Sequence, residues 1–210
     1  MTPNNICAMA RLKGLDAIAV CDHQSAGMLP ALNACARRQG LLLLPGLEIC
    51  SREEVHLLCY FEQLEDALAM GDWCSARLPQ TLNRPDYFGH QWLMDEQDQV
   101  TGEEQRMLIL ALEVGLDEVC DQARALNGVP VPAHINRGSH GILGALGFLP
   151  PGNDFKTLEI VPALPCRMDL SGFRQLYSSD AHRLGDIAEA VHSLPVARDS
   201  RAILDWMRGP

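Results

Sequence analysis

The sequence is short of basic and of aromatic side chains. Its 210 residues include 17 lysines and arginines against 27 aspartates and glutamates, and only 5% are aromatic. The formal charge of −10 argues against binding of a nucleic-acid backbone through clustered positive charge, so we expect no stable nucleic-acid partner. Phosphate binding through metal ions stays open, because divalent cations reverse the local field of an acidic site.

The sequence also lacks the marks of secretion, membrane insertion and disulfide scaffolds. No secretory signal follows Met1, and no apolar run approaches the ~20 residues of a membrane span. The eight cysteines include no pair at the spacing of a zinc knuckle or a redox dithiol. We therefore expect a cytoplasmic protein without membrane contact, whose thiols are reduced and mostly buried.

What is present is the composition of one folded domain. Hydrophobic residues make up 47% of the chain and charged residues 21%, which is within the range of globular proteins. A chain of this length buries roughly 70% of its unfolded surface. Neither an internal repeat nor a low-complexity tract interrupts it, so a single domain over residues 1–210 is predicted.

Short apolar runs alternate with amphipathic segments, which predicts an α/β fold with parallel strands, either doubly wound or closed into a barrel. Between the third and fourth strands, residues 62–127 are predicted to be an insertion with helices of its own. The predicted strands are 16–21, 41–44 (closed by Pro45-Gly46), 55–61, 129–133, 157–161 and 175–178, and the predicted helices are 3–13, 26–39, 103–115, 116–128 and 200–208.

Carboxylates and imidazoles follow these apolar runs repeatedly. Because the carboxyl ends of parallel strands meet at one edge, such side chains are expected to lie together there. Aspartate, glutamate and neutral histidine are ligands for Zn, Mn or Fe. The residues are Asp22 and His23 after the first strand, Glu48 after the second, His134 after the fourth, Asp180 and His182 after the sixth, and His56 within the third.

Each of these residues alone has a structural interpretation. Asp22 and His23 fit a helix cap beside a hydrogen-bonded imidazole, Glu48 an ordinary loop carboxylate, and His56 an inward strand histidine bonded to a carbonyl. His134 is harder to explain, because a polar ring ending a buried strand needs a partner. Taken together they favour a metal site, since independent structural reasons rarely place so many such groups at one edge.

The other histidines and the neighbouring cysteines have no such support. His90, His140 and His192 are expected at surface or supporting positions. Thiols within apolar runs are usually inert core groups, which is the expectation for Cys21, Cys50 and Cys59.

An ordered set of short motifs then indicates a family. The motifs are residues 1–6 (MTPNNI), 13–16 (KGLD), 22–23 (DH), 45–48 (PGLE), 53–56 (EEVH), 88–89 (FG), 132–137 (PAHINR), 146–150 (LGFLP) and 178–182 (SSDAH). They extend over nearly the whole chain, and their order makes the set specific although no single one is decisive. With them the chain resembles the PHP (polymerase and histidinol phosphatase) domains of the small stand-alone phosphoesterase type.

The resemblance implies a distorted (β/α)7 barrel that holds up to three divalent metals and hydrolyses a phosphate ester by metal-bound hydroxide. In this scheme the bridging ligand is Glu48, His56 and His134 complete one metal, Asp180 binds the next, and His23 with His182 holds a third, with Asp22 orienting its neighbour. Arg137 is a candidate for the substrate phosphate, because its guanidinium matches phosphate oxygens, with a loop salt bridge as an equal alternative.

One departure from the family pattern concerns the first strand. Family members begin with a strand that carries a His-x-His pair, and this sequence opens on a helix at Met1 instead. The expectation is a barrel whose first strand is missing, which would remove two ligands from the metal bound by Asp180 and one from that of His23 and His182.

These observations predict a metal-dependent phosphoesterase that acts on a small phosphorylated metabolite or nucleotide, with Glu48, Asp180 and Arg137 as its catalytic residues. The alternative is a catalytically impaired domain that serves as a metal-binding or partner-binding module. A third interpretation, a metal amidohydrolase, calls for a lysine at a strand end, and the two lysines of the chain, Lys13 and Lys156, are poorly placed for it.

Overall fold

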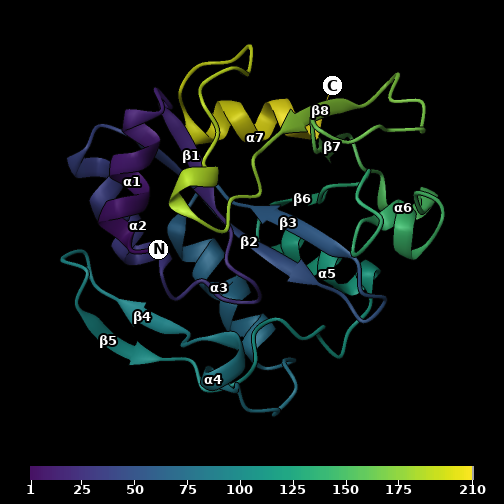
Figure 1. Ribbon diagram of the computed structural model, residues 1–210. Coiled ribbons are helices and arrows are strands. Elements are labelled where there is room, and N and C mark those ends of the chain that lie inside the picture. The colour runs from purple at the N-terminus through teal and green to yellow at the C-terminus, as the bar shows by residue number, and fades with distance from the viewer. Residues whose placement is uncertain (210) are drawn as a thin grey trace.

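The computed structural model describes residues 1–209 of the chain (Figure 1). Helices and strands alternate through most of it. In chain order they are α1 (Pro3–Leu12), β1 (Ala17–Val20), α2 (Leu29–Arg38), β2 (Leu42–Cys50), β3 (His56–Tyr60), α3 (Leu64–Ser75), α4 (Pro85–Phe88), β4 (Trp92–Met94), β5 (Val100–Glu103), α5 (Leu116–Ala125), β6 (Val129–Pro132), α6 (Ile142–Ala145), the 3-10 turn η1 (Pro151–Asn153), β7 (Thr157–Ile160), β8 (Arg174–Tyr177), η2 (Leu184–Asp186) and α7 (Ser200–Arg208).

The main sheet has the order β1-β2-β3-β6 and is mixed rather than parallel. β1 pairs with β2 in parallel, whereas β3 is antiparallel to both β2 and β6. The prediction of parallel strands is therefore wrong at β3. Residues 51–55 join β2 to β3 directly, and so short a connection closes a hairpin, because a parallel crossover needs a dozen residues or more.

The remaining strands form two small sheets, β4 with β5 and β7 with β8. β7 follows the edge of the main sheet, where the Ile135 N–H donates to the Glu159 carbonyl at 3.0 Å. Among residues 1–209 the strands thus form three separate hydrogen-bonded sheets, and the fold is mixed α/β. The predicted (β/α)7 barrel is not confirmed.

The two faces of the main sheet pack against different helices, as strand alternation dictates. Leu47, Leu57 and Cys59 belong to a core with residues of α2, α3 and α5. On the other face, Leu44, Leu58 and Val131 pack with residues of α7. α7 therefore closes one end of the second face, and the opposite end is left for polar side chains.

β2 is longer than predicted, because Pro45 and Gly46 continue the strand rather than end it. A Cβ at Gly46 would lie 2.8 Å from the Cys21 sulfur and 3.0 Å from a ring carbon of Tyr60. Glycine at this position allows β1 and β3 to approach β2 closely from both sides. The extension carries Glu48 and Cys50 beyond the apolar part of the strand.

The helix predicted over residues 103–115 does not form. Its backbone groups bond to other segments, since the Leu112 N–H donates to the Cys50 carbonyl at 2.9 Å and the Val114 carbonyl accepts from the Arg52 N–H at 2.8 Å. The predicted helix over 116–128 is present as α5. The segment before it lines the β2–β3 hairpin instead.

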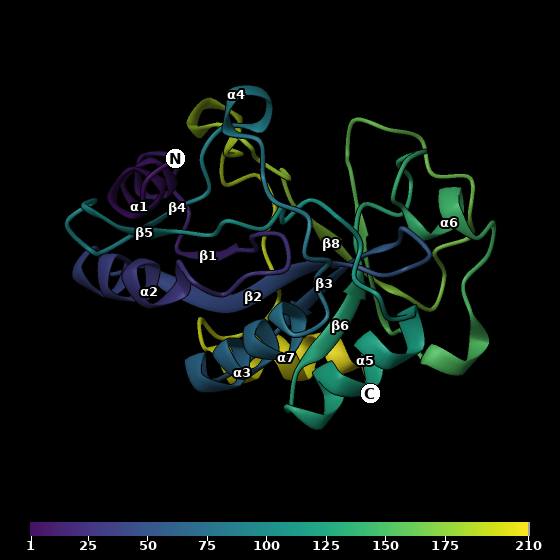
Figure 2. The same ribbon diagram turned by 90° about the horizontal axis from the view of Figure 1, so that it is seen from below.

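Seen from below, α3 and α5 lie on one side of the strands and α4 lies on the other (Figure 2). The long insertion therefore contributes elements to both sides. Of the helices in residues 1–209, none combines the length and apolarity needed to cross a bilayer.

Candidate metal centre

β1 and β2 together position the first two polar residues. Beyond the end of β1 the parallel pairing resumes, with the Glu48 N–H donating to the Asp22 carbonyl at 3.1 Å and the Gln24 N–H to the Glu48 carbonyl at 3.0 Å. His23 and Glu48 are thereby placed side by side. The His23 Nε2 lies 3.9 Å from Glu48 Oε2.

The β2–β3 hairpin adds His56. Because β3 is antiparallel to β2, its first residue lies at the same edge as the last residues of β2, and His56 pairs with Cys50. Alternation along β2 puts Glu48 and Cys50 on one face. The His56 Nδ1 is 2.7 Å from Glu48 Oε1.

His134, just after β6, completes this group. Its Nε2 lies 3.2 Å from Glu48 Oε1 and 3.3 Å from His56 Nδ1. His134 has a φ of 30°, a conformation that non-glycine residues rarely adopt and that is found mostly where surrounding contacts impose it. Here the contact is with Glu159, whose Oε2 accepts the His134 backbone N–H at 2.7 Å.

The charges in this group favour cation binding. Burial opposes ionisation of Glu48, but hydrogen bonds with His134 and His56 outweigh it and hold the pKa of this carboxyl well below its ordinary value. Burial lowers the pKa of His23, so its imidazole is neutral at neutral pH and keeps a lone pair for a cation. The group therefore offers a carboxylate at Glu48 and a neutral imidazole at His23.

Two imidazole nitrogens in this group, on the ring positions that do not face Glu48, lack hydrogen-bond partners. The Nδ1 atoms of His23 and His134 are buried without a hydrogen-bond partner, which is unusual for polar atoms in a folded protein. Ligands about 2.1 Å from a tetrahedral cation stand about 3.4 Å apart. The His134 Nε2 lies 3.2 Å from Glu48 Oε1 and 3.3 Å from His56 Nδ1, close to that value, whereas His56 Nδ1 and Glu48 Oε1, 2.7 Å apart, are hydrogen-bonded to each other. These residues fit a divalent cation.

Within residues 1–209, the hydrogen bonds and ion pairs of the Glu48 side chain do not involve the other three predicted ligands. Asp180 pairs with Arg137 at 2.6 Å, and His182 is exposed, with its Nδ1 2.9 Å from the Asp180 carbonyl. Both lie near enough for their charges to act on the pKa of His23. Asp22 has an exposed side chain, and its contact with Glu48 is made by its backbone carbonyl.

Arg137 therefore takes the loop salt-bridge geometry in this structure. Its side chain is 38% exposed, whereas that of Asp180 is 14% exposed. An ion pair with a partly exposed guanidinium is easily exchanged for another anion, since such pairs contribute little free energy. Arg137 remains a candidate for binding a phosphate.

Glu159 was not among the predicted site residues. This side chain is 4% exposed within β7, accepts the backbone N–H of His134 and is hydrogen-bonded by the Ser178 hydroxyl. Burial raises its pKa. A carboxylate inside the apolar run 157–161 was the signal, because a buried carboxyl needs partners and thus marks a constrained position.

His140 also lies closer to the centre than expected. Its ring stacks on that of His56, with centroids 4.6 Å apart and an interplanar angle of 17°. Its side chain is exposed, as expected for a surface position, but it covers one of the candidate ligands.

Comparison with known proteins gives similarity at the level of the fold. No protein-family profile matches the sequence, and no curated protein matches it. A protein from Bifidobacterium adolescentis assigned as a metal-dependent phosphoesterase superposes with a TM-score of 0.62 at 16% identity, over 97% of this chain and 89% of its own. The lesion-specific endonuclease Q from Pyrococcus furiosus superposes with a TM-score of 0.61 at 16% identity, over all of this chain.

The chain has a PHP-type fold. The resemblance inferred from the motifs is confirmed at this level. The chain spans about half the length of endonuclease Q, 51% in that structure and 52% in a complex with a 27-mer duplex that has an abasic lesion at the active site.

The sequence predicted a small phosphorylated substrate and no nucleic-acid partner, partly because of the negative net charge. This prediction is wrong. Endonuclease Q, with the same fold over this whole chain, takes duplex DNA at its active site. Net charge sums the whole surface, whereas phosphate is bound locally, by metal ions and nearby guanidinium groups. A formal charge of −10 therefore does not exclude a nucleic-acid substrate.

Proposed function

We propose that the protein is a metal-dependent phosphoester hydrolase whose centre is built on Glu48. The main support is the position of its two carboxylate oxygens. Oε1 faces His56 and His134, at 2.7 and 3.2 Å, and Oε2 faces His23 at 3.9 Å. A carboxylate with imidazoles on both oxygens is suited to bridge two cations.

In this proposal Glu48, His56 and His134 hold one cation of the Mn, Zn or Fe type. Asp180 binds the next, and His23 with His182 holds a further one, so the full centre has up to three. Divalent cations in such a centre lower the pKa of a water molecule and polarise a phosphoryl oxygen. The contacts of Glu159 with His134 fix the backbone that carries one of the imidazoles.

Arg137 contributes positive charge beside this centre. Its guanidinium is held by Asp180 at 2.6 Å, and its side chain is 38% exposed. A planar guanidinium bonds two phosphate oxygens at once. In the proposal an incoming phosphate takes over the guanidinium, and Asp180 becomes free to bind a cation.

The lysines argue against a lysine-assisted amidohydrolase. The Lys13 Nζ lies 2.5 Å from Glu189, and the Lys156 Nζ lies 2.5 Å from Asp154. Both amines therefore have carboxylate partners that are not among the candidate ligands. This favours phosphate esters as the substrate class, and it includes both monoesters and the diesters of nucleic acids.

The proposal is tested with metal-stripped protein reloaded with Mn²⁺, Zn²⁺ or Fe²⁺. Three substrates are compared: an aryl phosphate monoester, an aryl phosphodiester and a duplex oligonucleotide with an abasic site. Turnover of any of them that depends on the cation and disappears in Glu48→Gln is the expected result. The matched control is Glu65→Gln, an exposed carboxylate on α3.

Two results would contradict the proposal. Turnover that survives Glu48→Gln would place the chemistry elsewhere. Binding of one cation equivalent with no turnover of any substrate would instead support the module that binds metal without catalysis.

A further inference from the structure

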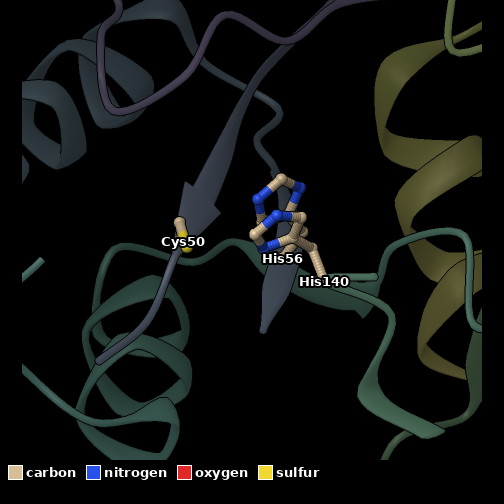
Figure 3. A group of neighbouring side chains, drawn as sticks. All are labelled: Cys50, His56 and His140. Carbon is tan, nitrogen blue, oxygen red and sulfur yellow. The ribbon is translucent and has the colours of Figure 1, made fainter. Parts of the chain in front are cut away.

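Beside the Glu48 group lies a second set of donor atoms of a different character. Cys50, His56 and His140 each offer one ligand atom, and these atoms all lie within 4.8 Å of one another. Figure 3 shows the imidazole rings of His56 and His140 face to face, with Cys50 at the end of β2 beside them. We propose that these three residues form a separate site for a soft divalent cation of the Zn²⁺ type.

The hairpin register explains why Cys50 and His56 meet. The two residues are a direct cross-strand pair, Cys50 ending β2 and His56 beginning β3. Cys50 is 2% exposed, and its thiol has only a weak contact, with the Ser51 carbonyl at 3.7 Å. Burial raises the pKa of this thiol to about 12, so a cation that binds the sulfur has to displace its proton, but no strong hydrogen bond has to be broken.

The hydrogen bonds of both imidazoles point to ligation through Nε2. The His56 Nδ1 faces Glu48 Oε1 at 2.7 Å, and the His140 Nδ1 faces the Glu54 carbonyl at 3.3 Å. An acceptor at Nδ1 draws the ring proton there and leaves the Nε2 lone pair free. Histidines that ligate metals commonly have this arrangement, a carboxylate or carbonyl behind the ring.

The loop that carries His140 is built to hold it in place. The His56 N–H donates to the His140 carbonyl at 2.9 Å. His140 has a φ of 57°, and a Cβ on the following Gly141 would lie 2.6 Å from the Arg137 carbonyl oxygen. The glycine thus allows the loop to pass close to residues 134–137, which places the ring over His56.

Sulfur and nitrogen donors select the cation. A site with one thiolate and two imidazoles prefers Zn²⁺, whereas Mn²⁺ prefers oxygen ligands. Three protein ligands leave a fourth tetrahedral position, and the exposure of His140 opens it to solvent. His56 belongs to both donor sets, so the two sites compete for one ring, because a neutral imidazole has a single free lone pair.

The test uses Co²⁺ as a spectroscopic substitute for Zn²⁺ in the metal-stripped full chain at neutral pH. A thiolate bound to Co²⁺ gives a near-ultraviolet charge-transfer absorption that oxygen and nitrogen ligands do not. We expect this band in the wild-type protein and its displacement by Zn²⁺. Cys50→Ser should abolish it, and Cys21→Ser, at a half-buried thiol beside Gly46, should leave it unchanged.

His140→Ala is the second variant. Because the His140 side chain is exposed, this substitution should leave the fold intact, so a loss of Co²⁺ binding reports the loss of a ligand. It should weaken Co²⁺ binding, followed by the same band, at least about tenfold. A wild-type protein without the band, or a band that survives Cys50→Ser, would overturn the inference. The readout is independent of turnover, so an inactive protein that shows the band would refute the proposed function and leave this site standing.

Discussion

The two halves of the predicted ligand set differ in how far the folded chain assembles them. Glu48, His56 and His134 lie in mutual contact and are buried, whereas Asp180 is engaged by Arg137 and His182 is exposed. The first group stands on strands of one hydrogen-bonded sheet. The second follows β8, which belongs to a separate two-stranded sheet.

The difference shows what backbone pairing contributes to a metal centre. Register along β2, β3 and the end of β6 fixes three donors before any cation is present, which reduces the ordering cost of binding. Donors outside that sheet keep other partners. We therefore expect the first half to bind a cation tightly and the second half to bind weakly.

The sharpest test of this comparison is His134→Ala against His182→Ala. Loss of His134 should weaken Mn²⁺ or Zn²⁺ binding to the Glu48 group at least about 100-fold, and loss of His182 should weaken it less than about tenfold. Isothermal titration of metal-stripped protein measures both. Equal losses would show that the two halves act as one centre.

Arg137→Ala should change cation affinity in the opposite direction, by raising it. Removal of the guanidinium frees the Asp180 carboxylate, which it contacts at 2.6 Å, so affinity for a second cation should rise by about threefold to tenfold, in line with the loss of one partly exposed ion pair. Arg137→Lys is the control that keeps the charge. If the second cation binds more weakly in Arg137→Ala, the ion pair is not in competition with the metal.

Gly46→Ala tests whether the close approach of the strands holds the first half together. The added Cβ meets Cys21 and Tyr60 at 2.8 and 3.0 Å, so we expect a loss of about 1–3 kcal/mol in the free energy of unfolding. Gly152→Ala, where no atom lies within 4 Å of an added Cβ, is the matched control. Urea denaturation of both variants measures the difference, and equal midpoints would contradict the packing argument.

The smallest effect is expected in the insertion, away from both halves. Burial opposes ionisation of Glu104, but hydrogen bonds from Arg106 at 3.0 and 3.1 Å outweigh it and lower its pKa below the usual 4.5. The ionised Glu104 therefore contributes fully to stability above about pH 4.5, and this contribution is lost as the pH falls through the lowered pKa.

Glu104→Gln should cost about 1 kcal/mol at neutral pH and flatten the decline in stability under acidic conditions. Thermal unfolding between neutral and acidic pH measures this, with Glu65→Gln as the exposed control. A decline as steep as that of the wild type would assign the acid sensitivity to other carboxyl groups.

The sequence predicted what depends on local pattern. The positions of β1, β6, β7, α5 and α7 follow from apolar runs and helix periodicity, and they agree with the structure to within a residue or two at most ends. Glu48 and His134 were predicted as candidate ligands because each follows an apolar run, and His56 was added although it lies within one. Their mutual contact was expected from a parallel sheet.

That reason was incorrect, although the residues do meet. His56 reaches the edge because β3 is antiparallel and begins there, a matter of how the short segment 51–55 closes, which periodicity does not report. The missing helix at 103–115 has a similar cause, because its backbone bonds to Cys50 and Arg52, distant in the chain. Glu159 was passed over because a carboxylate within a strand resembles any other until its partners are known.

The β2–β3 hairpin also bears on how the protein folds. Glu48 and His56 are eight positions apart, whereas His56 and His134 are separated by 78. Local hairpins form in microseconds, and contacts between distant segments form later. A chain that folds in the presence of a divalent cation would hold two of its ligands before the third arrives, so the metal supply during synthesis is expected to affect the yield of native protein.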